Sequence, residues 1–358
     1  MICLMPNNQR LKKVYAQLAH QRLDGLFLCL PANISYLTRS LSRDSYLVAS
    51  LKGNIYITDS RYTEEAKACL KGIAVVKKYT GSLFKTIALT FTELGLKRVG
   101  FESRYLPFAE HQKIKDSLAQ GIDFIPVHSI VETLRQIKEE DEARKIQAAA
   151  RITLKAMDFI RDFLLPGVAE VEVAAELERF IRYNGASAHA FDIIVASGPN
   201  AAYPHHITSA RKLREGEMVL IDMGVDYSGY KSDLTRTFFL GKINVLARRV
   251  YNAVQEAQAR AIRQIKPGVL TSKVDAAARS FLAAEGFDKC FGHNVGHGVG
   301  LEIHEAPAIS PRDTSALEPG MVFTVEPGVY LPGKLGVRIE DMVRVTQKGV
   351  EVLSGTID

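Results

Sequence analysis

The stretch VLIDMGVDYSGYKSDLTRTFFL, residues 219–240, has the pattern of a β-hairpin with an acidic residue on each arm. An apolar run ends at Asp222, the turn-forming residues Tyr227, Ser228 and Gly229 follow, and Asp233 opens the returning run. If the turn is centred between Tyr227 and Ser228, Asp222 and Asp233 face each other with Cβ atoms roughly 4.5–5.5 Å apart. Like charges placed in this way destabilise a sheet, so the pattern predicts a cation between them.

A second stretch, MVFTVEPGVYLPGKLGVRIEDMVRV at residues 321–345, repeats the arrangement with glutamates. Glu326 and Glu340 are equidistant from Gly333, which lies in the predicted turn Pro332-Gly333-Lys334. Four carboxylates balance the charge of two divalent ions, and carboxylates with one imidazole suit hard to borderline metals. We therefore expect two divalent metal ions, with Mn²⁺ the first expectation and Co²⁺, Fe²⁺ or Zn²⁺ the alternatives. This is the composition of a two-metal hydrolytic site, with the metals about 3.5–4 Å apart.

Six of the nine histidines lie between residues 189 and 304, on either side of the first acidic hairpin. The segment GHNVGHGVGLEIHE, residues 292–305, places His293, His297 and His304 in a glycine-rich loop that runs into a short strand. Further upstream, SGPNAAYPHH at residues 197–206 ends in His205 and His206. The glycines do not indicate a phosphate-binding loop, because no Lys-Ser/Thr follows them and no strand-loop-helix context fits.

Composition describes an ordinary globular protein of two domains. The chain has 358 residues, 47% of them hydrophobic, and no apolar stretch approaches the length of a membrane span. The first residues lack the apolar region of a signal peptide, so none is expected. The cysteines (Cys3, Cys29, Cys69 and Cys290) are scattered without CxxC spacing. They are typical of free or buried thiols in a reducing compartment, and a cytoplasmic location is expected.

The net charge of +6 does not by itself predict a nucleic-acid partner. Basic residues in the N-terminal part form short dispersed pairs, such as Lys12-Lys13 and Lys77-Lys78, without an aromatic-laced stripe. A solvated surface explains them, so we expect neither a nucleic-acid nor a membrane partner.

The chain is expected to divide into an α/β domain at residues 1–130 and a second domain at residues 131–358. In the first, hydrophobic patterning predicts helices over residues 10–23 and 106–118 and strands at 25–30, 46–50, 54–58 and 98–102. Asp59 is the expected N-cap of a further helix that extends to Leu70.

The second domain contains an internal duplication. LLPGVAEVEVAAELERFIRYNGA, from Leu164, aligns with IKPGVLTSKVDAAARSFLAAEGF, from Ile265, at a constant offset of 101. An amphipathic helix precedes each copy, at residues 139–163 and 246–264, and one acidic hairpin follows each copy. We therefore expect two related halves around a pseudo-twofold axis, with the two acidic hairpins meeting between them. A site between two halves is a common place for a pocket.

The motifs resemble, in order and spacing, those of the dinuclear metallopeptidases of the pita-bread fold, and most closely the Xaa-Pro aminopeptidases and prolidases. DGLFLCLPANISYLT, from Asp24, and NIYITDSRYTEEA, from Asn54, are similar to the accessory domain of this group. The resemblance covers nearly the whole chain. It implies an α/β (α+β) protein with a small N-terminal creatinase-like domain and a C-terminal pita-bread domain. It also implies five metal ligands: Asp222, Asp233, His297, Glu326 and Glu340.

Within that set, the resemblance implies that Asp233 and Glu340 bridge both metals, that Asp222 holds one, and that His297 and Glu326 hold the other. Glu326, or a group hydrogen-bonded to it, would accept a proton from the nucleophilic water. The resemblance implies that the resulting hydroxide bridges the two metals.

The remaining site residues would act on the substrate. His205 matches the histidine that contacts the reacting carbonyl, although His206 could exchange with it. His304 matches the one that binds substrate or transfers a proton to the leaving group. His293 is either a pocket residue or a structural group of its loop. Arg338 either orients a site carboxylate or forms a structural ion pair.

The function implied is metal-dependent hydrolysis of the bond between an N-terminal residue and proline, by a homodimeric Xaa-Pro aminopeptidase. A prolidase, restricted to Xaa-Pro dipeptides, is the alternative, and the sequence does not separate the two. In methionine aminopeptidases the two glutamates stand much further apart than Glu326 and Glu340, which argues against that enzyme. A non-catalytic binding module and a metal-free amidinohydrolase related to creatinase are the remaining alternatives.

Overall fold

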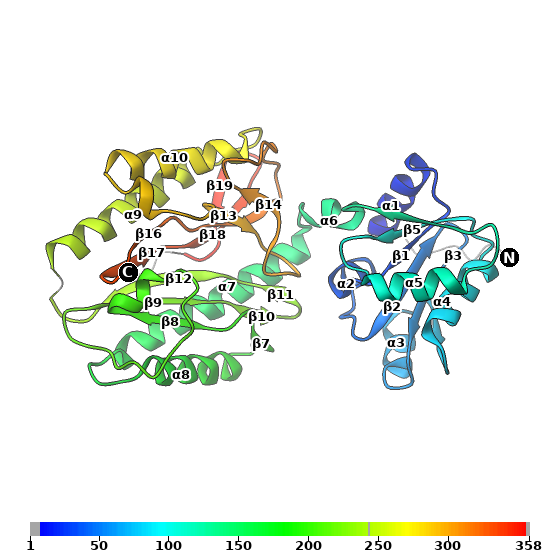
Figure 1. Cartoon of the computed structure of the whole chain (residues 1–358), viewed down its shortest axis with the longest axis horizontal. Helices are drawn as coiled ribbons and strands as arrows, with labels where there is room; N and C mark the ends of the chain where they lie inside the picture. The colour runs from blue at the N-terminus through cyan, green and yellow to red at the C-terminus, as the bar shows by residue number, and fades with distance from the viewer. Residues whose placement is uncertain (1–7, 243, 356–358) are drawn as a thin grey trace. The chain divides into compact units, whose positions relative to one another are not determined.

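The computed structural model describes residues 8–242 and 244–355, and the chain divides into two compact units between Arg135 and Gln136. The division predicted from the sequence lies after residue 130. The intervening helix α6 (Ile130–Arg135) packs against helices α1 (Gln9–His20) and α2 (Pro31–Thr38) of the first unit. Figure 1 shows the first unit in blue to cyan and the second in green to red.

The N-terminal unit is a six-stranded sheet with helices. The strand order is β4-β3-β2-β1-β5-β6, and β1 runs antiparallel to β2 but parallel to β5. The strands are β1 (Gly25–Leu28), β2 (Ser45–Ser50), β3 (Gly53–Thr58), β4 (Val75–Lys78), β5 (Arg98–Glu102) and β6 (Asp123–Val127). Besides α1, α2 and α6, the helices are α3 (Thr63–Cys69), α4 (Leu83–Glu93) and α5 (Phe108–Ser117).

One helix start predicted in this unit is wrong. Helix α3 begins at Thr63 with Tyr62 as its N-cap, not at Asp59. The Asp59 carboxylate instead accepts hydrogen bonds from the backbone N–H of Arg61 at 2.8 Å and from the Arg61 guanidinium at 2.7 Å. This local turn satisfies the carboxylate before the helix begins.

In its described residues, the C-terminal unit contains two pairs of α-helices and four small sheets. The sheets have the orders β11-β10-β7, β12-β9-β8, β14-β13-β15-β18-β19 and β16-β17. The first half contains α7 (Glu140–Ile160), η1 (Arg161–Phe163), α8 (Glu170–Tyr183), β7 (Ala188–His189), β8 (Ile194–Ser197), η2 (Gly198–Ala202), β9 (Met218–Met223), β10 (Val225–Tyr227), β11 (Tyr230–Lys231) and β12 (Leu234–Phe239). The second contains α9 (Val245–Gln264), α10 (Thr271–Ala284), η3 (Asp288–Cys290), β13 (Gly296–Gly298), β14 (Glu305–Ile309), β15 (Val322–Val325), β16 (Gly328–Leu331), β17 (Leu335–Arg338), β18 (Asp341–Val345) and β19 (Val350–Val352).

The duplication extends to the backbone. Helices α8 and α10 each have 14 residues, and both their starts and their ends are 101 residues apart. The glycines that precede them, Gly167 and Gly268, have φ values of 94° and 83°, which L-residues rarely adopt. Their N–H groups donate to equivalent carbonyls, those of Leu213 at 2.9 Å and Leu317 at 2.8 Å. The repeat found in the sequence is therefore a repeat of structure.

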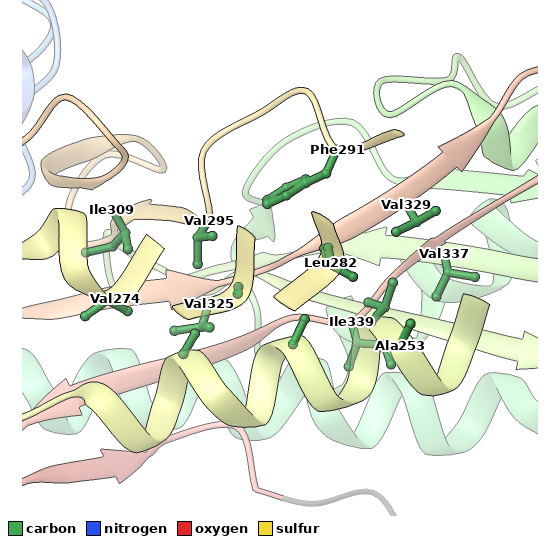
Figure 2. Close-up of a cluster of buried hydrophobic side chains, with 14 of the residues drawn as sticks. Ala253, Val274, Leu282, Phe291, Val295, Ile309, Val325, Val329, Val337 and Ile339 are labelled. Carbon is green, nitrogen blue, oxygen red and sulfur yellow. The ribbon is translucent and has the colours of Figure 1, made fainter. Parts of the chain in front are cut away.

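Each half of the second unit has an apolar core beneath its acidic hairpin. In the second half the core lies between the helices α9 and α10 and the strands β15 to β17, as Figure 2 shows. Val325, Val329 and Val337 are all 0% exposed and pack with α9 through Ala253 and its neighbours. Full burial of each valine contributes about 1.5–3 kcal/mol relative to an exposed one. Apolar packing against the helices thereby holds in place the hairpin that carries the acidic residues.

In residues 8–242 and 244–355, none of the helices combines the length and the apolar character that a membrane span requires. Cys29, Cys69 and Cys290 are free thiols. Cys3 lies outside the described residues.

Candidate metal centre

The first acidic hairpin has a different register from the one predicted. Asp222 pairs with Thr235, so Asp222 and Asp233 do not face each other directly. The turn residues are Ser228 and Gly229, with φ values of 53° and 84°. A type I′ turn requires positive φ at both central positions, and this places the centre one residue later than expected. Because the pairing shifts by two positions, Asp233 keeps its predicted face and lies diagonally from Asp222.

The second acidic hairpin has the predicted register. Leu331 pairs with Leu335 around Gly333, whose φ is 71°. The same register continues in the adjoining pair β15 and β18, where Val325 is opposite Asp341. Glu326 and Glu340 therefore occupy opposite positions in the short gap between the two ladders.

A single cavity of about 830 Å³ brings the predicted site residues together. Side chains from both halves of the second unit line it. They include every predicted metal ligand and substrate residue: His205, Asp222, Asp233, His293, His297, His304, Glu326, Arg338 and Glu340.

The centre of this cavity has the donor atoms of a metal site. Asp233, His297 and Glu340 each offer one atom, and these three atoms lie within 4.8 Å of one another. The Nε2 atom of His297 lies 3.4 Å from Asp233 Oδ2 and 3.3 Å from Glu326 Oε1. Within the described part of the chain, Asp222 Oδ1 and Glu340 Oε1 are buried without a hydrogen-bond partner. Unpaired buried carboxylate oxygens that converge in this way are suited to a cation.

Electrostatics support the same conclusion. Burial raises the pKa of Asp233, and the charges of Asp222 and Glu326 raise it further. Burial is also the largest cause of the raised pKa of Glu340, and the charges of Asp233 and Glu326 raise it further. The pKa of Glu326 is raised by burial, although His297 opposes the shift. Bound cations would relieve both the burial and the mutual repulsion, so these residues fit a divalent metal centre.

Arg338 is fully enclosed beside this centre and binds a site carboxylate. Its guanidinium donates to Asp222 Oδ2 at 2.6 Å, to the Tyr330 hydroxyl at 2.8 Å and to Thr235 Oγ1 at 3.0 Å. Thr235 in turn donates to Glu340 Oε2 at 2.7 Å. Arg338 is therefore bonded directly to one predicted ligand and through Thr235 to another.

Sequence reasoning missed Tyr330 and Thr235. The strand register contains the signal for both residues. Thr235 is paired with Asp222. Tyr330 lies two positions after Gly328, which is paired with Arg338. Residues two apart on a strand share a face. Without that register, a threonine or a tyrosine in a strand does not indicate a functional site.

Tyr330 also binds His293. The Nδ1 atom of His293 is 2.7 Å from the carbonyl of Asn294 and therefore carries a hydrogen, so Nε2 accepts from the Tyr330 hydroxyl at 2.8 Å. Burial lowers the pKa of His293 to about 4, and the charge of Arg338 adds to the shift. A neutral His293 thus ends a chain that runs through Tyr330 and Arg338 to Asp222.

The other histidines differ in their surroundings. The rings of His297 and His304 lie 4.2 Å apart, and burial followed by the charge of His297 lowers the pKa of His304. His205 and His206 both reach the cavity, but His206 Nε2 lies 2.9 Å from Oε2 of the buried Glu170. His206 therefore has a structural partner, which favours His205 as the residue facing the substrate.

Comparison with known proteins agrees with this description. A buried cluster of carboxylates and imidazole in an open cavity defines the class of site that metal-dependent hydrolases use. Residues 144–347 match the model of metallopeptidase family M24, and residues 10–137 match that of the creatinase/prolidase N-terminal domain. The chain belongs to metallopeptidase family M24. It is thus an enzyme of a class that uses divalent metal ions, and the expected pita-bread fold with a creatinase-like N-terminal domain is confirmed.

Similarity to individual proteins extends over the full length. The uncharacterized peptidase YqhT of Bacillus subtilis is 38% identical over 341 residues, which are 95% of each chain. Among solved structures, the Xaa-Pro dipeptidase from Bacillus anthracis has a TM-score of 0.94 and 37% identity, with 98% of each chain covered. The X-Pro aminopeptidase from Thermotoga maritima MSB8 has a TM-score of 0.89 and 33% identity, and the match covers 97% of this chain and 98% of that one.

Proposed function

We propose that this protein hydrolyses the peptide bond between an N-terminal residue and a following proline. The observation that carries the proposal is the convergence of the five proposed metal ligands, four further histidines and Arg338 on one cavity. The similarity to proteins named Xaa-Pro dipeptidase and X-Pro aminopeptidase supports the choice of bond.

Two divalent ions, Mn²⁺ first and Co²⁺, Fe²⁺ or Zn²⁺ as alternatives, are proposed as the cofactor. Asp222, Asp233, His297, Glu326 and Glu340 would hold them. When bound, such ions lower the pKa of water and polarise a carbonyl.

The protein's own groups would move the protons. Glu326 Oε1 accepts a hydrogen bond from the Thr324 hydroxyl at 3.1 Å, which orients the carboxylate that takes up a proton from water. His205 would donate a hydrogen bond to the oxyanion that develops at the scissile carbonyl. His304 would deliver a proton to the leaving nitrogen, because a proline nitrogen must be protonated before it departs.

The cavity also suits a proline ring. Phe191, Ile194 and Ile303 line it beside the charged cluster. Proline has no amide hydrogen and its φ is fixed near −65°, so a shaped apolar wall selects it at small entropic cost.

The length of the substrate is the open choice within this proposal. We propose an Xaa-Pro aminopeptidase that acts on longer peptides. A prolidase is the second candidate, favoured by the relatives named Xaa-Pro dipeptidase, among them a Pyrococcus furiosus protein 36% identical over 350 residues.

The proposal further includes a homodimer, tested by mass measurement in solution. It also includes a cytoplasmic location, to which the free thiols of Cys29, Cys69 and Cys290 are suited.

The test is a comparison of substrates on the metal-loaded enzyme. Peptides of the form Xaa-Pro-Xaa should be cleaved with a far higher kcat/KM than matched Xaa-Ala-Xaa peptides, and equal values would contradict the proposal. In the same assay, an Xaa-Pro dipeptide should be a poorer substrate than the tripeptide. The reverse order would identify a prolidase.

A further inference from the structure

The segment that carries His205 is bound at both ends by one buried carboxylate, that of Glu170. Glu170 is the first residue of α8 and is 0% exposed. Its Oε1 accepts hydrogen bonds from the backbone N–H of Ser197 at 2.8 Å and from the Ser197 hydroxyl at 2.7 Å. Its Oε2 accepts from the Ser209 hydroxyl at 2.6 Å and from the Ser209 backbone N–H at 3.2 Å. The carboxylate therefore closes the loop formed by residues 198–208.

The middle of the loop is bound to the same carboxylate. Asn200 Nδ2 donates to Glu170 Oε1 at 3.0 Å. His206 Nε2 lies 2.9 Å from Glu170 Oε2, so this nitrogen carries the hydrogen and donates it. His206 is the neighbour of His205, and a fixed His206 ring limits where the His205 backbone can lie.

Glu170 is suited to this role because it is charged. Burial raises its pKa, but the hydrogen bonds from Ser209, His206 and Ser197 together outweigh burial and hold the pKa below its usual value. An ionised acceptor binds its donors more strongly than a neutral one. A buried and fully satisfied polar network of this kind fixes a single arrangement.

Apolar packing fixes only the first part of the loop, where Ala201 and Ala202 are 1% and 6% exposed and Ala201 packs in a buried apolar cluster. Two of its apolar side chains are largely in solvent, since Tyr203 is 62% exposed and Ile207 is 86% exposed. The position of residues 203–208, the part that carries His205, therefore depends strongly on polar contacts, which include a hydrogen bond from Arg338 Nη1 to the carbonyl of Pro204 at 3.2 Å. Arg211 adds one more, from its Nη1 to Ser197 Oγ at 2.5 Å.

We propose that Glu170 is a positioning residue for the reaction, which acts through Ser197, Ser209 and His206 to hold His205 at the substrate carbonyl. The proposal rests on the proposed function of His205. A displacement of about 1 Å of a catalytic group costs on the order of 100-fold in rate. His206 thereby acquires a role distinct from that of His205, namely to bind the carboxylate and not the substrate.

The first test is Glu170→Gln, which keeps the shape of the side chain but replaces an acceptor oxygen with an NH₂ group. That group must face the donors of either Ser197 or Ser209, whose backbone N–H cannot turn away. We expect kcat on an Xaa-Pro peptide to fall about 10- to 100-fold while the bound metal per chain stays unchanged. In a His205→Ala background the same substitution should have little further effect, because the two residues act through one group. Independent, multiplying effects would overturn the proposal.

Two further variants separate positioning from stability. Glu172 lies on the same helix and accepts the backbone N–H of Ala169, the N-cap residue, at 2.6 Å, and within the described residues no hydrogen bond joins it to the loop. Glu172→Gln should lower thermal stability and leave kcat unchanged. His206→Gln, which keeps a donor, should retain more activity than His206→Leu. Equal losses in these two variants would contradict the role of His206.

Hydrogen exchange tests the loop without any assay of activity. In Glu170→Gln, the amides of residues 198–208 should exchange faster than in the unmodified protein, while those of β15 and β18 should not change. Unchanged exchange in the loop would overturn the proposal. If the unmodified protein has no activity on Xaa-Pro peptides, the proposed function is rejected, and this exchange result decides by itself whether Glu170 fixes the loop.

Discussion

Arg338 donates a hydrogen bond to Asp222 Oδ2 at 2.6 Å, and both side chains are largely removed from solvent, with 3% and 13% of the side-chain surface exposed. The two residues belong to different hairpins, 116 positions apart. Removing one partner of a buried ion pair leaves an uncompensated charge and costs about 3–5 kcal/mol. The relationship therefore links the two duplicated halves at the proposed metal centre.

Arg338→Lys should impair the enzyme although it keeps the charge. A lysine ammonium cannot reproduce the planar set of bonds to Asp222, Tyr330 and Thr235. We expect kcat to fall on the order of 100-fold, with a smaller fall in metal content. Steady-state kinetics and metal analysis measure the two effects. The control is Arg344→Lys in the adjoining strand β18, because Arg344 pairs with the exposed Glu140 and such pairs contribute about 0–1 kcal/mol.

Asp233→Asn should weaken metal binding and remove most of the activity. The change keeps the side-chain shape but removes a charge and an anionic ligand atom from the cluster with His297 and Glu340. Calorimetric titration of the chelated protein with Mn²⁺ should give a Kd raised by at least a factor of ten. The matched change is Asp226→Asn in the same hairpin, where the carboxylate binds the backbone N–H of Gly229 at 2.9 Å and contacts Lys231. It should cost about 1 kcal/mol of stability or less and leave metal affinity unaltered. Equal effects at the two positions would contradict the assignment of Asp233.

Removal of metal should lower stability as well as activity. Without cations, Asp233, Glu340 and Glu326 are buried like-charged groups, and a ligand bound only by the folded state stabilises it by mass action. Exhaustive chelation should therefore abolish hydrolysis and lower Tm, and Mn²⁺ or Co²⁺ should restore both. Full activity in a sample shown to be free of metal would refute the metal centre.

Gly296→Ala should damage the site through the backbone. A Cβ at this position would lie 1.9 Å from the carbonyl oxygen of Thr324, so β13 would have to move away from β15. His297 is the next residue and would move with it. We expect a loss of about 2–4 kcal/mol of stability, together with weaker metal binding. Gly349→Ala is the control, because nothing lies within 4 Å of its added Cβ. Denaturant melts of both variants measure the difference.

His293 should make the chelated protein less stable in mild acid. Burial depresses its pKa from 6.5 to about 4, so the unfolded chain binds a proton in this range that the folded chain does not. The free energy of unfolding therefore falls as the pH drops from about 6.5 towards about 4. Above about pH 6.5, His293 causes no loss of stability. His293→Gln should flatten this part of the stability curve relative to the unmodified protein. Urea melts at a series of pH values measure it, and parallel curves for the two proteins would show that His293 does not titrate as described.

The sequence alone was sufficient for the duplication and for the second hairpin. The offset of 101 depends on local features, namely turn glycines with positive φ and amphipathic helices, and the structure repeats them at the same spacing. Gly333 marks its turn, so Glu326 and Glu340 could be placed opposite each other by counting. The centre predicted for the first hairpin is one residue too early, because it rests on the midpoint between Asp222 and Asp233, which does not identify the residues that form the turn. Only the positive φ of Ser228 shows which pair forms it.

Tertiary structure decided how the predicted residues are used. His205 and His206 are adjacent and of the same type, so no local pattern separates them. They differ because Glu170, 36 positions from His206, accepts a hydrogen bond from one and not the other. Tyr330 belongs to the site because Arg338 and His293 bind it. The physical reason is that periodicity and turn chemistry depend on neighbours along the chain, whereas hydrogen-bond partners and burial depend on segments that meet only in the folded protein.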